Sequence, residues 1–145
     1  MITLVTRTVA KLLFLPSLMI ALATLVKGYA DTGDGFTAGV IAGLAVLLQI
    51  IVFGPAEVER KLPLRWAPRV AFAGLALALL DALAPLAFGR PVMTHLPPAG
   101  VEPIHFGSLE LLSAVVFDVG VFLLVFGFSV TAIVLLGRAS PVRLP

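Results

Sequence analysis

The chain has 145 residues, of which 60% are hydrophobic and only 12% are charged, and its mean hydropathy is +1.13. Soluble domains carry about 25% charged residues, so a water-soluble globular fold is excluded and lipid must cover much of the surface. The absence of cysteine excludes disulfides, thiolate metal sites and a cysteine nucleophile. The net charge of +2 comes from basic residues that are not clustered with aromatic residues, so no nucleic-acid partner is predicted.

Four apolar segments have the length of about 20 residues that spans a bilayer core. They are expected at about residues 8–26, 36–53, 70–88 and 109–136. A short acidic turn, a basic stretch with prolines and a proline-rich loop separate them. The sequence therefore predicts an all-α integral membrane protein with four transmembrane helices, forming a single domain over residues 1–145.

The first segment also has features of a signal peptide, because basic residues precede an apolar run and small residues occur near Ala30. However, Lys27 interrupts the expected cleavage region, and the apolar run is long for a signal peptide. We therefore expect the first helix to be retained.

The basic residues that flank the four segments predict the orientation of the chain. With a cytoplasmic N-terminus, eight lysines and arginines lie inside and two, Lys27 and Arg90, lie outside; the inner eight are Arg7, Lys11, Arg60, Lys61, Arg65, Arg69, Arg138 and Arg143. An excess of basic residues in cytoplasmic loops is the rule for membrane proteins, so both termini are predicted to be cytoplasmic.

Small residues recur at helical spacing in the second, third and fourth segments. Gly35, Gly39 and Gly43 share one face of the second helix, and Gly120 and Gly127 share one face of the fourth. Such faces let neighbouring helices approach closely in a membrane. They are expected to pack the chain's own helices, and some are expected to contact other subunits.

Two acidic residues, Asp81 and Asp118, lie within apolar segments. Carboxylates at membrane depth are costly, and they usually mark an ion path or a polar contact inside a helix bundle. If the third and fourth helices pack together, the two carboxylates lie close enough in depth to influence each other's protonation. Both alternatives, a relay for protons or cations and a hydrogen bond between helices, remain open from the residues alone.

The other ionisable residues have weaker patterns. Glu110 is expected in the first turn of the fourth helix. Lys11 lies only a few residues from the start of the first helix, so its side chain can reach the membrane–water interface. His95 and His105 lie in the proline-rich loop without a carboxylate pattern, so no metal site is predicted. Neither a nucleotide loop, a catalytic triad nor a redox motif is recognisable, so we expect no independent enzyme and no cofactor.

Several motifs in the same order resemble the MnhB/MrpB family, the B subunits of the multisubunit Mrp-type sodium/proton antiporters. The similar stretches cover nearly the whole chain and are Arg7-Thr8-Val9-Ala10-Lys11-Leu12-Leu13, Gly33-Asp34-Gly35-Phe36 followed by Gly39, Phe88-Gly89-Arg90-Pro91 with Thr94-His95, and Glu110 followed by Phe117-Asp118-Val119-Gly120-Val121 and Gly127. Asp81 is not part of the family pattern.

The resemblance implies a small component of a prokaryotic cell-membrane complex that exchanges Na⁺ for H⁺ as an assembly. Its partners would be lipid and the other membrane subunits, some of which resemble the proton-pumping arm of respiratory complex I. The resemblance adds Glu110, Lys11 and His95 to Asp118 and Asp81 as candidates for the ion path, and it assigns Phe36 with Gly35 and Gly39 to the entry of the second helix. Two alternatives remain, a structural subunit and an accessory subunit of a complex I-like, hydrogenase-type assembly.

Overall fold

The computed structural model describes residues 3–28, 33–93, 104–106, 109–111 and 113–139. Four helical stretches in it are long and apolar enough to cross a membrane, which confirms the predicted all-α class with four spans. The stretches are α1 (Leu4–Lys27), α2 (Asp34–Phe53), α4 (Ala67–Leu83) with the short 3-10 helices that flank it, and α5 (Ser113–Ala139).

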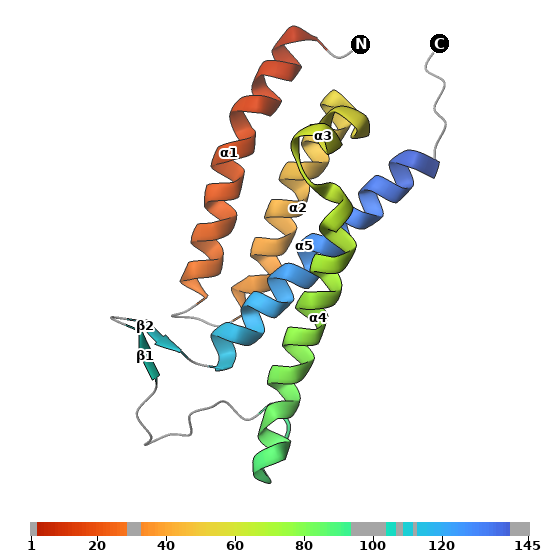
Figure 1. Cartoon of the computed structure of the whole chain (residues 1–145). Helices are drawn as coiled ribbons and strands as arrows, with labels where there is room; N and C mark the ends of the chain where they lie inside the picture. Colours follow the sequence, from red (N-terminus) through yellow and green to blue (C-terminus); the bar gives the residue numbers. More distant parts are fainter. Residues whose placement is uncertain (1–2, 29–32, 94–103, 107–108, 112, 140–145) are drawn as a thin grey trace.

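The helices pack in the order α1, α2, α5, α4, so that α2 lies between α1 and α5, and α5 lies between α2 and α4 (Figure 1). The end of the bundle where α1 begins is also the end where α5 finishes. This shared end agrees with an even number of spans.

The third span changes conformation near its end. The α-helix α4 stops at Leu83 and continues as the 3-10 helix η2 (Ala84–Phe88) instead of reaching residue 88 as an α-helix. Pro85 explains the change, because proline has no N–H to donate and its ring clashes with the carbonyl four residues earlier. Gly89, with φ of 67°, then ends the segment in a left-handed conformation.

A short amphipathic helix, α3 (Pro55–Lys61), follows α2 directly and was not predicted. Proline stands at its first position, an acid in its first turn and two basic residues in its last turn, which is the usual arrangement at helix ends. The 3-10 helix η1 (Leu64–Trp66) then leads into α4. Together α3 and η1 lie over the end of the bundle where α1 begins.

The fourth helix begins later than predicted. Residues 109–111 form strand β2 (Leu109–Leu111), which pairs antiparallel with β1 (Ile104–Phe106), and α5 begins at Ser113. The prediction that Glu110 occupies the first helical turn is therefore wrong: Glu110 lies in β2, at the register position opposite His105.

The buried core lies at the end of the bundle near α3. It combines residues of α2, α3, η1, α4 and α5, namely Val46, Ile50, Val58, Leu64, Ala67, Val130 and Val134. Toward the opposite end the contacts between α2 and α5 and between α4 and α5 are made largely by glycine and alanine. Close backbone contact thus replaces bulky side chains where the candidate site lies.

Candidate site at the start of helix α2

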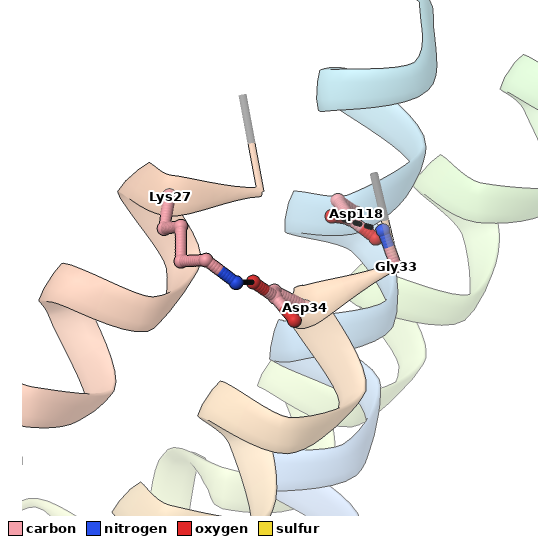
Figure 2. A network of polar contacts seen from close by, with 4 residues as sticks. All are labelled: Lys27, Gly33, Asp34 and Asp118. Carbon is pink, nitrogen blue, oxygen red and sulfur yellow. Dashed lines mark hydrogen bonds and ion pairs between the residues drawn. The ribbon is translucent and has the colours of Figure 1, made fainter. Parts of the chain in front are cut away.

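The candidate site lies where α2 begins, beside Asp118 of α5. Gly33 is the N-cap residue of α2 and has φ of 118°, a left-handed conformation that glycine adopts without strain. It has no side chain with which to satisfy the amide groups at the helix start. Asp118 supplies an acceptor for one of these amides: its Oδ2 accepts a hydrogen bond from the Gly33 N–H at 3.0 Å (Figure 2).

Asp118 is only 5% exposed, although it lies beside the start of α2 and the first residues of a helix are often solvated. A buried carboxylate requires compensation by hydrogen bonds or charge. The compensation here comes from a backbone amide and from the start of α2, because the amino end of a helix carries partial positive charge. Asp118 therefore acts as a capping group supplied by a different helix.

Glycines make this approach possible. A Cβ atom on Gly35 would overlap the backbone carbonyl oxygen of Asp118 and would lie 2.9 Å from its carbonyl carbon. A Cβ on Gly28, at the end of α1, would lie 2.7 Å from Asp118 Oδ2. Both distances are too short for any other residue type without rearrangement, so the end of α1, the first turn of α2 and the second turn of α5 meet around one carboxylate.

An ion pair connects this buried site to the exposed surface. Lys27 Nζ lies 3.2 Å from Asp34 Oδ2, and the two side chains are 67% and 26% exposed (Figure 2). Asp34 is the residue after Gly33 and stands in the first turn of α2, where negative charge is favoured. A buried and a half-exposed carboxylate thus lie near the start of α2, with a lysine at the rim.

A change of charge on Asp118 would act directly on the start of α2, because its carboxylate accepts a hydrogen bond from the Gly33 amide there. Because α5 runs from Ser113 to Ala139, Asp118 lies about 12 Å from the midpoint of its helix. The carboxylate therefore belongs to the end of the membrane span rather than to its middle.

Asp81 of α4 lies in the same half of the bundle as Asp118, but α4 packs on a different side of α5 from the side that carries Asp118. At this depth α5 meets α4 through Gly120, whose added Cβ would lie 2.8 Å from the Ala78 nitrogen. Gly120 points about 200° away from Asp118 around the helix, and Asp118 faces α2. Asp81 is half-buried in α4. The mutual influence of the two aspartates thus stays a prediction.

The remaining candidates for the ion path are placed as follows by the part of the chain that the structure describes. Lys11 lies at the opposite end, in the half of α1 near its start, and His95 lies outside the described residues. Glu110 lies in β2, as stated above. Phe36 is 59% exposed, so it presents its ring to the surroundings of the bundle.

The glycines singled out from the sequence lie at contacts within the chain. Gly39 and Gly43 of α2 face Val125 and Ser129 of α5, and Gly127 of α5 faces Ala71 of α4. Together with Gly35 and Gly120, they draw the backbones of α2, α5 and α4 together. The structure thus gives these residues a packing role inside the subunit.

Sequence reasoning missed one buried polar residue, Gln49 in α2. It is 8% exposed, and its Nε2 donates a hydrogen bond to the Ala10 carbonyl oxygen of α1 at 2.8 Å. An amide side chain in an otherwise apolar span was the available signal, since polar side chains in membranes tend to hydrogen-bond between helices. Gln49 ties α1 to α2 near the end opposite Asp118.

Comparison with known proteins gives a single family. The family model described as a domain related to the MnhB subunit of Na⁺/H⁺ antiporter matches residues 5–131. The B subunit of the Na⁺/H⁺ antiporter of Bacillus subtilis is 33% identical over 135 residues, covering 93% of each chain, and that of Alkalihalophilus pseudofirmus is 31% identical over 106 residues, covering 73% of this chain and 72% of the relative. A chain of Rhizobium meliloti, named as the A/B subunit of a probable K⁺/H⁺ antiporter, is 32% identical over 151 residues, covering 95% of this chain and 14% of that longer one.

Proposed function

Because this chain belongs to the family of domains related to the MnhB subunit of the Na⁺/H⁺ antiporter, we propose that it is the B subunit of a multisubunit cation/proton antiporter in which Asp118 borders the ion route. The observation that carries the role of Asp118 is its buried carboxylate, held at the start of α2 and flanked by the half-exposed Asp34. Since the relatives are named for Na⁺ in two cases and K⁺ in another, the proposal specifies a monovalent cation.

The partners in this proposal are the other membrane subunits of the antiporter. In the Rhizobium meliloti relative, the similar region is part of a longer chain whose name joins the A and B subunits. The A-type component is therefore the first neighbour that we propose. The outward faces of α1 and α4 are available for it, since both carry many exposed large apolar side chains.

We also propose that the end of the bundle near α3 faces the cytoplasm of a prokaryotic cell. Most of the described basic residues lie at that end, including Arg60, Lys61, Arg65 and Arg138, whereas Lys27 and Arg90 lie at the other. The positive-inside rule supports this orientation. It places Asp118, Asp34 and Lys27 near the external surface.

A scaffold role is the second candidate, because the same hydrogen bond to Gly33 would also serve a purely structural cap. The substitution Asp118→Asn separates the two. Asparagine has nearly the same shape and its carbonyl oxygen still accepts a hydrogen bond, but it carries no charge and takes up no proton.

The test measures cation-dependent collapse of a pH gradient in everted membrane vesicles, with assembly of the complex followed on a native gel. We expect Asp118→Asn to assemble normally and to lose most of its exchange activity with Na⁺ and K⁺. Glu59→Gln is the matched control, since it also changes a carboxylate to an amide, at the opposite end. Full exchange by assembled Asp118→Asn would exclude Asp118 from the route and leave the scaffold role.

A further inference from the structure

Two adjoining pockets open at the end of the bundle near α3, away from the site of Asp118. Each has a volume of about 220 Å³, and Phe14 and Leu62 line both. The first is lined mainly by α1, the end of α2 and α3, and the second lies among α1, α2, α4, α5 and the connection to α4. The two pockets therefore adjoin at Phe14 and Leu62, and we refer to them together as a slot with two chemically different halves.

The first half has an excess of positive charge. Lys11 and Lys61 line it with a single carboxylate, that of Glu57. Glu57 is already shared between Lys61 Nζ at 2.9 Å and Arg60 Nη2 at 2.7 Å. Lys11 Nζ lies 5.6 Å from the centre of the Phe53 ring, and it takes part in none of the ion pairs among the described residues. Glu57 is therefore already paired with two cations, and Lys11 is a further positive charge in this half.

The second half is apolar. Apart from backbone atoms, it is lined by aliphatic, aromatic and proline side chains, among them Leu18, Val46, Val70 and Phe126. Phe14 and Leu18 line it from successive turns of α1. A ligand that fills both halves must have a negatively charged head and an apolar chain.

The position of the slot suits a lipid. Trp66, which also lines the apolar half, stacks with Arg69, whose Cζ lies 4.5 Å from the ring centre. Tryptophan is enriched at the membrane–water interface, and arginine is enriched in the cytoplasmic loops beside it. Basic pockets between transmembrane helices at the cytoplasmic side are known places for anionic lipid headgroups.

We propose that this slot binds one anionic phospholipid, with its phosphate between Lys11 and Lys61 and an acyl chain between α1 and α4. The proposal does not depend on the role of Asp118, so either can fail without the other.

The test uses native mass spectrometry of the purified full chain in detergent, with phosphatidylglycerol or phosphatidylcholine added at equal concentration. We expect the wild type to retain one phosphatidylglycerol in preference to phosphatidylcholine. Each of Lys11→Gln and Lys61→Gln should weaken retention about fivefold, the effect of roughly one basic residue near an anionic lipid. Lys27→Gln is the matched control at the other end and should leave retention unchanged.

Two further variants guard against loss of folding. Lys11→Arg together with Lys61→Arg keeps the charge and should restore retention. Leu18→Trp fills the apolar half without changing charge and should reduce retention of both lipids. Equal retention of the two lipids by the wild type, or unchanged phosphatidylglycerol retention in both glutamine variants, would overturn the proposal. So would a structure of the complex with a neighbouring subunit's side chains in the slot.

Discussion

The contact between Gly35 and Asp118 provides a direct test of how closely α2 and α5 approach. A Cβ at position 35 meets only backbone atoms, including the Asp118 Cα at 3.1 Å. No flexible side chain can move aside, so Gly35→Ala must displace one helix from the other. Overpacking of this kind typically costs about 1–3 kcal/mol, and the displacement also stretches the hydrogen bond from Gly33 to Asp118.

Alanine also has a higher helix propensity than glycine, by about 0.8–1.0 kcal/mol, and this gain must be removed from the measurement. Gly137→Ala supplies the correction. Gly137 lies in the last turn of α5, and an added Cβ there meets nothing within 4 Å. The difference between the two variants isolates the steric cost.

The measurement is reversible unfolding of the purified chain in mixed detergent and dodecyl sulfate, followed by far-ultraviolet circular dichroism. We expect Gly137→Ala to be as stable as the wild type or slightly more stable. Gly35→Ala should be less stable than Gly137→Ala by about 1–3 kcal/mol. Equal stability of the two variants would refute the close contact between α2 and α5 at this point.

Three further predictions concern single polar groups. Asp118→Ala should destabilise the chain by about 1–3 kcal/mol more than Asp118→Asn in the same unfolding assay, because alanine leaves the Gly33 amide without its acceptor. Gln49→Leu should cost only about 0.6 kcal/mol there, the average for hydrogen bonds between membrane helices, and a loss above roughly 2 kcal/mol would show that this bond dominates the α1–α2 contact. The hydrogen bond from Lys61 lowers the pKa of Glu57 below the ordinary carboxyl value of 4.5. The charged carboxylate therefore stabilises α3 above pH 4.5. This stabilisation is lost as the pH falls through the lower pKa of the folded state. Amide exchange in α3 should therefore quicken below about pH 4.5 in the wild type, and Glu57→Gln should abolish that added pH dependence.

The four spans could be predicted because long apolar segments have few alternatives in a membrane. The predicted helix boundaries differ from the observed ones where apolar character does not distinguish one backbone conformation from another. Residues 109–111 include two leucines that extend the apolar run of the following helix, yet they form a strand because a partner strand is present. The break at Pro85 was readable in principle, since proline removes a helix hydrogen bond, but the apolar run continues through it.

The candidate site was only partly predictable. Asp118 stands out by its chemistry, and the spacing of Gly35 and Gly39 indicates a close helix contact. That both features describe one place could not be read from the sequence, because Asp118 and Gly35 are far apart along the chain. The hydrogen bond from Gly33 depends on the way α2 and α5 pack, and so does the separation of Asp118 from Asp81 around α5.

The two roles considered for Asp118 are physically coupled. A charged carboxylate at a helix start is favoured by about 0.3–1 kcal/mol at the surface and up to ~2 kcal/mol when partly buried. Uptake of a proton or a cation by Asp118 would cancel this favourable interaction between its charge and the helix start, and would loosen the first turn of α2. Asp118→Asn imitates the neutral state, so hydrogen exchange of the amides over residues 33–37 should be about 2- to 30-fold faster in this variant than in the wild type, with α4 unchanged. Identical exchange in the two proteins would show that the charge of Asp118 does not hold the start of α2, and the coupling would then be absent.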